Sequence, residues 1–226
     1  MSTKIRVAIL DDHQSVIDGY FFRLNPVPDI EVVASARYGA ELEMLLERQL
    51  VDVLLLDIQV QVSPENPNPY PVLQVIPRLL QFHPELAVLV ITMHSQSALV
   101  RNVIAAGCSG YILKEDWAAI ENLAAIIRSA ASGGVYFSQK AYQAYLRHHS
   151  APPELTQRQL EALSLCAAYP NAKISDLAKK MCVANSSMRN LLSNAYLRLE
   201  VTNKTAAVLK ARQLGLITPD EPRYEI

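Results

Sequence analysis

Short apolar runs alternate with helical patterns through the first 134 residues, and this alternation restricts the folds open to the chain. The runs predict strands at 5–10, 31–36, 53–56, 87–91 and 110–113, and the helical spacing predicts helices at 14–24, 40–50, 72–82, 96–106 and 116–132. Strands that are apolar on both faces belong in a covered parallel sheet. We therefore expect an α/β fold with a doubly wound five-stranded parallel sheet, which binds its ligands at the carboxyl ends of the strands.

Composition excludes several classes of protein. Half of the residues are hydrophobic, which is enough apolar material for a packed core and argues against disorder. The apolar stretches at 53–56 and 86–91 are far shorter than the ~20 residues of a membrane helix, and the first residues lack the pattern of a signal peptide. Cys108, Cys166 and Cys182 are an odd number without a Cys-x-x-Cys motif. We expect a cytoplasmic protein with no membrane association.

Polar side chains follow four of the predicted strands. Asp11 and Asp12 follow the first strand, Asp57 the third, Thr92 the fourth and Lys114 the fifth. A single polar residue at a strand end is ordinary, but three carboxylates at one edge repel one another unless a cation lies among them. Carboxylate oxygens with open positions suit Mg²⁺ beside a phosphoryl group. The hydroxyl and the ammonium are then placed to bind phosphoryl oxygens.

Residues 1–134 resemble the receiver domain of two-component response regulators, a flavodoxin-like fold. The matching motifs are Asp11-Asp12-His13, Leu55-Leu56-Asp57-Ile58, Val90-Ile91-Thr92-Met93-His94 and Gly110-Tyr111-Ile112-Leu113-Lys114. Gly133-Gly134-Val135-Tyr136 is similar to the NarL/FixJ subgroup. The four motifs fall in order on the predicted strands, so together they are more specific than any one alone.

The resemblance implies a role for each of these residues. Asp57 is expected to accept a phosphoryl group from a sensor histidine kinase or a small phosphodonor. The implied Mg²⁺ ligands are Asp11, Asp12, Asp57 and the backbone carbonyl of Gln59. Lys114 and Thr92 are expected to bind the phosphoryl oxygens, and Thr92 and Tyr111 to form the conformational switch. From their positions alone, we expect His13 to cap or pack at a helix start, and His94 to be a solvated loop histidine.

The loop after Asp57 departs from the receiver pattern. Position 61 is Gln where a proline is usual, and the segment 61–71 is several residues longer, has four prolines and has no glycine. The prolines favour extended backbone. This loop either alters phosphorylation or is a tolerated surface insertion. A receiver that never takes a phosphoryl group is a further alternative.

The second part of the chain is basic. Residues 155–217 hold nine Lys or Arg against three acids, whereas residues 1–154 carry a net charge of −5. We expect a linker with a short helix at 135–154, a helical DNA-binding domain at 155–217 and a tail at 218–226, with helices at 156–168, 174–182, 185–200 and 203–214. Helix count and charge alone fit a helix-turn-helix module or any small helical domain.

Residues 155–217 resemble the LuxR-type helix-turn-helix domain. The matching motifs are Leu155-Thr156-Gln157-Arg158-Gln159, Ile174-Ser175-Asp176-Leu177-Ala178, Val183-Ala184-Asn185-Ser186-Ser187-Met188-Arg189-Asn190 and Leu199-Glu200-Val201-Thr202-Asn203-Lys204-Thr205-Ala206-Ala207. By position, the helix from residue 185 is expected in the major groove of double-stranded DNA, with Ser187, Arg189 and Asn190 near its bases or phosphates. Ser193, Arg198 and Lys204 are expected to contact the DNA backbone.

This domain also departs from its family pattern. Leu191 and Leu192 occupy positions where the family usually has a His and a basic residue. Gln159 occurs where Glu is common, and Glu200 where Gly is common. About two extra residues, around 169–172, lengthen the first turn. Because a lost phosphate contact lowers DNA affinity, the leucine pair indicates weaker DNA binding, a different operator or a helix that packs against protein.

Two functions fit these features. The first is a response regulator whose Mg²⁺-dependent phosphorylation at Asp57 switches homodimer formation and DNA binding to control transcription, with the dimer contact in the last helix. The alternative is a phosphorylation-independent regulator that acts by protein contact. We do not expect an enzyme: a phosphohydrolase on a similar sheet carries a second acid two residues after its nucleophile, and here that residue is Gln59.

Overall fold

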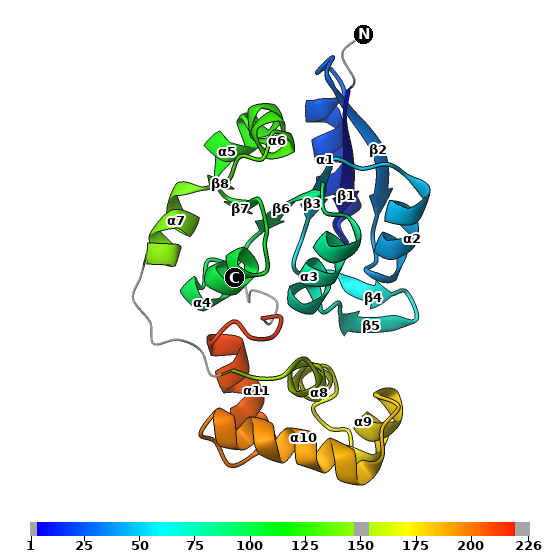
Figure 1. Ribbon diagram of the computed structural model, residues 1–226, viewed down its shortest axis with the longest axis vertical. Coiled ribbons are helices and arrows are strands. Elements are labelled where there is room, and N and C mark those ends of the chain that lie inside the picture. Colours follow the sequence, from blue (N-terminus) through cyan, green and yellow to red (C-terminus); the bar gives the residue numbers. More distant parts are fainter. Residues whose placement is uncertain (1–3, 147–153, 220–226) are drawn as a thin grey trace.

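The structure is a computed structural model that describes residues 4–146 and 154–219. An α/β part lies above a smaller helical part in the view of Figure 1. The expected tail beyond 219 and the middle of the expected linker, 147–153, lie outside the described residues.

The first part is built on a parallel sheet. Its strands stand in the order β2-β1-β3-β6-β7-β8. Their bounds are β1 Ile5–Leu10, β2 Ile30–Ala36, β3 Val53–Leu56, β6 Ala87–Thr92, β7 Gly110–Leu113 and β8 Tyr136–Phe137. This confirms the doubly wound α/β fold but corrects the expected number of strands from five to six. Only two residues long, β8 pairs with Gly110 and Tyr111 at the sheet edge and is too short to show a strand pattern.

The helices lie close to their predicted bounds. Those of the first part are α1 Gln14–Leu24, α2 Ala40–Arg48, α3 Val72–Phe82, α4 Ser97–Ala105, α5 Trp117–Glu121, α6 Leu123–Ala131 and α7 Gln139–Leu146. The single helix expected at 116–132 is two helices. Asn122, which lies between them, has backbone angles of φ −93° and ψ 15° and interrupts the regular helix.

Each strand contributes side chains to both faces of the sheet. In β1, Val7 and Ile9 pack with α1, α5 and α6, whereas Ala8 and Leu10 pack with α2, α3 and α4. This is the two-layer covering that a strand apolar on both faces requires. Because β1, β3, β6 and β7 pair in parallel, their carboxyl ends meet at one edge of the sheet, where the polar residues follow.

The proline-containing segment after β3 forms an ordered β-hairpin. Its strands are β4 Gln61–Ser63 and β5 Asn66–Pro69, paired antiparallel. The backbone N–H of Gly39 donates to the carbonyl of Gln61 at 2.8 Å. The Tyr70 ring fills the space beside Gly39, where a Cβ would lie 2.0 Å from it. The insertion is therefore packed against the rest of the first part.

The second part packs four helices around one core. They are α8 Gln157–Ala168, α9 Ile174–Lys180, α10 Asn185–Arg198 and α11 Lys204–Gln213. Thr156 caps α8 as predicted: it forms a capping box with Gln159, so Gln serves where Glu is common. After α10, Glu200 has a left-handed backbone with φ 53°, a conformation that suits glycine better than any residue with a Cβ.

Candidate functional site

A buried ion triad lies at the carboxyl edge of the sheet. Lys114, which follows β7, donates from Nζ to Asp11 Oδ2 and to Asp57 Oδ2, each at 2.7 Å. The Asp11 and Asp57 side chains are 2% and 6% exposed, and that of Lys114 is 15% exposed. The structure thus brings together three of the predicted site residues from the ends of three strands. The Asp57 carboxylate is thus buried at the edge of the sheet with a cation directly beside it.

Burial and charge shift the pKa values within this triad. The pKa of the Asp11 carboxyl is raised, because burial and the charge of Asp57 outweigh the stabilising charge of Lys114. Burial lowers the pKa of Lys114, but the two carboxylates outweigh it, and the net shift is upward. Lys114 therefore stays a cation, and it is the group that compensates the two acids.

Asp12 faces a different neighbourhood from Asp11. Its Oδ1 is buried and receives no aligned hydrogen bond from the described residues, although Nδ1 of His13 lies 2.6 Å away as an ion-pair partner. Side-chain ligand atoms of Asp11, Asp12 and His13 lie within 4.8 Å of one another. Two neighbouring carboxylates, one of which has a buried oxygen with no aligned hydrogen bond from the described residues, fit a Mg²⁺ ligand set. His13 occupies the N-cap position of α1, but its side chain makes no capping hydrogen bond.

Thr92 and Tyr111 both bond the backbone of His94. The N–H of His94 donates to Thr92 Oγ1 at 3.4 Å, and the Tyr111 hydroxyl donates to the carbonyl of His94 at 2.7 Å. Both Thr92 and Tyr111 are 0% exposed. Burial also raises the pKa of Tyr111, so its hydroxyl remains a donor. The two predicted switch residues are thus joined through one backbone unit that leads into α4.

His94 is not the solvated loop histidine that we expected. It is 4% exposed, and Nε2 donates to Oε1 of Gln59 at 2.8 Å. Burial lowers its pKa, against the charge of Asp57, so the imidazole favours its neutral form. The expectation was wrong because a residue two positions past a strand is normally exposed, whereas here the side chain of Gln59 reaches across to it. The predicted role of the Gln59 backbone carbonyl stays a prediction.

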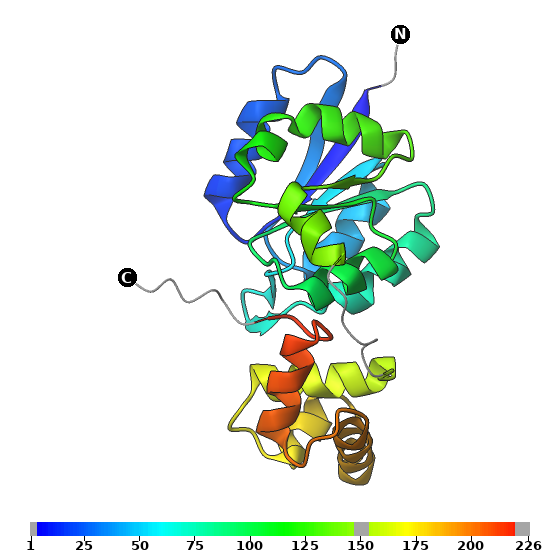
Figure 2. The ribbon, with the colours of Figure 1, turned by 90° about the vertical axis from the view of Figure 1, so that its left-hand side faces the viewer.

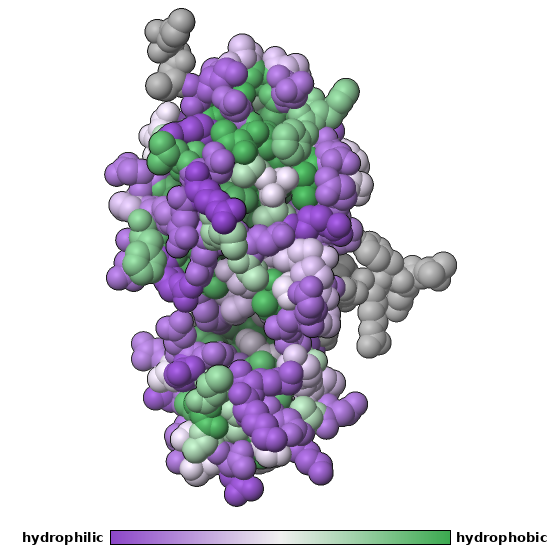
Figure 3. All heavy atoms as spheres, turned by 90° about the vertical axis from the view of Figure 1, so that its right-hand side faces the viewer, coloured by the Kyte–Doolittle hydropathy of each residue, from purple (hydrophilic) through white to green (hydrophobic). Residues whose placement is uncertain are grey.

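The α10 helix turns a polar face to solvent. Ser187, Arg189, Asn190, Ser193 and Arg198 are exposed, and Lys204 at the start of α11 is half-buried. Arg189 and Lys204, with Lys173, line a groove of about 530 Å³ between α10 and the start of α9. Arg198 donates to the carbonyl of Glu154, and Lys204 donates to the carbonyls of Pro170 and Ala172. Figure 3 shows that hydrophilic side chains predominate on the viewed face of the second, helical part, at the bottom of the molecule.

The two leucines of α10 do different things. Leu192 is 2% exposed and belongs to the domain core, so it does not replace a phosphate contact. Leu191 is half-buried and packs at the edge of the same core. The exposed apolar residue of this helix is instead Leu197, at 75% exposure, which the sequence reasoning missed. Its position one helical turn from Ser193 could have indicated this.

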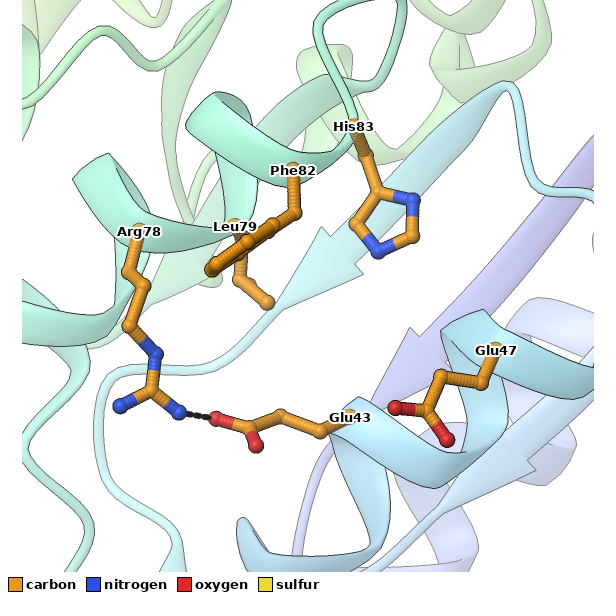
Figure 4. Close-up of a pocket in the computed structure, with 6 residues that line it drawn as sticks. All are labelled: Glu43, Glu47, Arg78, Leu79, Phe82 and His83. Carbon is orange, nitrogen blue, oxygen red and sulfur yellow. Dashed lines mark ion pairs between the residues drawn. The ribbon is translucent and has the colours of Figure 1, made fainter.

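A separate groove of about 630 Å³ runs between α2 and α3. Figure 4 shows Glu43 and Glu47 of α2 facing Arg78, Leu79 and Phe82 of α3, with an ion pair between Arg78 and Glu43. None of the predicted site residues lines it. Within residues 4–146 and 154–219, no helix has both the length and the apolar character that crossing a bilayer requires.

Comparison with known proteins agrees with this geometry. The family model of the response regulator receiver domain matches residues 7–128, and the chain belongs to the response regulator family. Among its relatives, the transcriptional regulatory protein LiaR of Bacillus subtilis (strain 168) is 30% identical over 220 residues, covering 94% of this chain and 99% of LiaR. The transcriptional regulatory protein DegU of Brevibacillus brevis is 27% identical, covering 95% of each chain. The predicted resemblance is confirmed.

Solved structures show the same fold. RcsB from Salmonella enterica serovar Typhimurium, bound to a promoter in the presence of the phosphomimetic BeF₃⁻, aligns with a TM-score of 0.60 at 19% sequence identity. The alignment covers 94% of this chain and 100% of that chain. The receiver fold and the helical part that follows it are therefore arranged along the chain as in a full-length regulator.

Proposed function

We propose that this response regulator is switched by phosphorylation of Asp57 and controls transcription by binding double-stranded DNA. The observation that carries the proposal is the Asp11–Lys114–Asp57 triad, which holds a carboxylate at the sheet edge beside a cation. A sensor histidine kinase or a small phosphodonor is the source of the phosphoryl group. The proposed receiver comprises residues 1–134, and the proposed DNA-binding domain comprises residues 155–217.

In the proposed reaction, a carboxylate oxygen of Asp57 attacks the donor phosphorus. The new phosphorus–oxygen bond forms as the bond to the donor's leaving group breaks, and the electron pair leaves with that group. Lys114 moves its hydrogen bond from Asp57 Oδ2 to a phosphoryl oxygen, which replaces one anionic partner by another. The Thr92 hydroxyl donates to a second phosphoryl oxygen, while its oxygen can still accept the N–H of His94.

The acidic residues fit a Mg²⁺ ion. Asp11, Asp12, Asp57 and the backbone carbonyl of Gln59 are the proposed ligands. The buried Oδ1 of Asp12, which receives no aligned hydrogen bond from the described residues, supports this set. When bound, Mg²⁺ supplies charge neutralisation between the carboxylates and the incoming phosphoryl group. With a cation held by Asp11, Lys114 would no longer be the sole compensating charge for that carboxylate, and its ammonium would be available to the phosphoryl oxygens.

The proposed DNA contacts lie on α10 and beside it. Ser187, Arg189 and Asn190 are the candidates for contacts to base edges or phosphates, and Ser193, Arg198 and Lys204 for contacts to the DNA backbone. The burial of Leu192 in the core removes part of the reason for the alternative of a regulator that acts only by protein contact. The active form is proposed to be a homodimer in the cytoplasm, and no catalytic turnover is part of its function.

Intact-mass analysis tests the phosphorylation step. The full chain and the Asp57→Asn variant are incubated with acetyl phosphate and Mg²⁺. Addition of one phosphate to the wild type alone supports the proposal, whereas no adduct on either overturns it. Titration of a duplex at several salt concentrations tests the DNA step: the logarithm of the binding constant should fall linearly with the logarithm of salt.

A further inference from the structure

Two segments in which the sequence departs from its families contact each other in the structure. Asn68 lies in the inserted hairpin of the first part, and Tyr169 lies in the lengthened turn of the second part. The side-chain amide of Asn68 donates to the Tyr169 hydroxyl at 2.5 Å. Lys180 lies over the Tyr169 ring, with Nζ 3.9 Å from the ring centre. A hydrogen bond between residues 101 positions apart thus joins the two atypical segments of the chain.

The hairpin presents Asn68 from a firmly held strand. Along β5 the prolines 67 and 69 are exposed, whereas Asn66 and Asn68 are half-buried on the opposite side. Proline has no N–H to donate, so it suits the outer positions of an edge strand. The N–H of Asn66 donates to Ser63 Oγ at 3.1 Å, which closes the hairpin. The alternation of proline and asparagine therefore turns an amide side chain toward the second part.

A second contact between the two parts of the chain lies on α4. The Asn102 amide donates to the carbonyls of Gly215 at 2.8 Å and Leu214 at 3.3 Å, just after α11. Gly215 fits so tightly that a Cβ there would lie 2.3 Å from the backbone nitrogen of Leu99. The groove between α3 and α8 is lined mainly by polar and charged residues, among them Arg78, Arg158 and Glu161. An interface of this polar kind can separate without exposing a large apolar surface.

The docked arrangement leaves the DNA-binding helix uncovered. Figures 1 and 2 show α10 on the side of the second part that faces away from the sheet, while the end of α11 reaches α4. Docking therefore restrains the orientation of the second part and the end of α11, without covering the α10 surface.

The same α4 helix begins directly after the predicted switch. Thr92 and Tyr111 bond the backbone of His94, and α4 starts at Ser97. We propose that the hairpin 61–69 and the turn 169–172 form an intramolecular docking contact that restrains the second domain in the unphosphorylated chain, and that phosphorylation releases it through α4. The second clause rests on the proposed function of Asp57. A shift of His94 changes the position of α4 against Gly215, and the docked state then loses part of its stabilisation.

Pulsed EPR on the full chain tests this contact. One spin label is attached to the native Cys182, which is exposed, and the second to Gln49→Cys at the end of α2. Cys108 and Cys166 are buried. The distance distribution is measured for the parent and for Asn68→Ala and Tyr169→Phe, each of which removes the hydrogen bond. Tyr142→Phe on α7 is the matched control.

The parent without phosphodonor is expected to give one narrow distance distribution. Because one hydrogen bond is removed, Asn68→Ala and Tyr169→Phe should each raise the ratio of undocked to docked molecules about twofold to tenfold, while Tyr142→Phe leaves it unchanged. Beryllofluoride with Mg²⁺ should broaden the parent distribution in the same way.

A broad parent distribution, or variants as narrow as the parent, overturns the docking contact. If the variants broaden but beryllofluoride changes nothing, the contact stands and its release by phosphorylation is overturned. Intact mass then separates two cases: a phosphate adduct on Asp57 retains the proposed function, and its absence refutes that function as well.

Discussion

Lys114 compensates two buried carboxylates, so its removal should have a cost that depends on pH. The Lys114→Met variant keeps most of the side-chain volume but leaves Asp11 and Asp57, at 2% and 6% exposure, without their shared cation. Breaking a buried ion pair costs about 3–5 kcal/mol. Because Lys114 is 15% exposed and water can partly replace it, we expect Lys114→Met to lower the free energy of unfolding by about 3 kcal/mol at pH 7.5.

Protonation limits this cost. The charge repulsion is relieved when one carboxyl takes a proton, which costs about 1.4 kcal/mol for each pH unit above its ordinary pKa of about 3.9. The loss of stability caused by Lys114→Met therefore cannot exceed about 5 kcal/mol at pH 7.5 and about 2 kcal/mol at pH 5.5. Burial already raises the pKa of Asp11 in the wild type, and loss of Lys114 raises it further. When a carboxyl has a higher pKa in the folded state than in the unfolded state, the free energy of unfolding falls as pH rises through that pKa. The variant is therefore expected to be destabilised most at high pH.

The assay is urea unfolding in the presence of a chelator, followed by fluorescence of Trp117, the single tryptophan of the chain. The control is Lys140→Met, which removes an exposed ion pair with Glu115 and should cost less than about 1 kcal/mol at either pH. A Lys114→Met cost equal to that of the control, or one that grows as pH falls, would refute the reasoning.

Three further predictions concern the second part of the chain. Glu200→Gly should raise the free energy of unfolding by about 1 kcal/mol in urea titration, because Glu200 has φ 53°; a loss of stability would contradict the strain. Leu192→Ala should cost about 2–5 kcal/mol, and Leu191→Ala less, since only Leu192 is fully in the core; equal costs would contradict this assignment. Arg189→Ala should weaken duplex binding and reduce the log–log salt slope by about one, whereas an unchanged slope would exclude a phosphate contact.

Much of the receiver followed from the sequence, because its strands are apolar on both faces and its polar residues stand directly at strand ends. That pattern placed Asp11, Asp57 and Lys114 at one edge, and the structure joins all three. It did not predict the burial of His94, which depends on a side chain 35 positions away rather than on local pattern. Pairwise contacts of this kind have no periodicity to read.

The insertion after Asp57 shows a similar limit. Four prolines predicted extended backbone, and the hairpin β4–β5 has it, but the sequence did not indicate which partner the hairpin meets. Leu192 was misjudged for a related reason: a family comparison assigned it to the DNA surface, whereas helical spacing from Met188 places it in the core. For a position on an amphipathic helix, the periodicity within the chain was the better guide.

Two cations proposed for the DNA backbone already bond carbonyl oxygens within the protein. Arg198 bonds Glu154, and Lys204 bonds Pro170 and Ala172. A carbonyl does not neutralise the charge, and a guanidinium has five N–H donors and an ammonium three, so both retain donors for a phosphate. The internal hydrogen bonds already restrict the rotamers of these two side chains, so less side-chain entropy is lost when they bind DNA. Lys204 is thereby held at the groove that Arg189 also lines, and the two charges are positioned before DNA arrives.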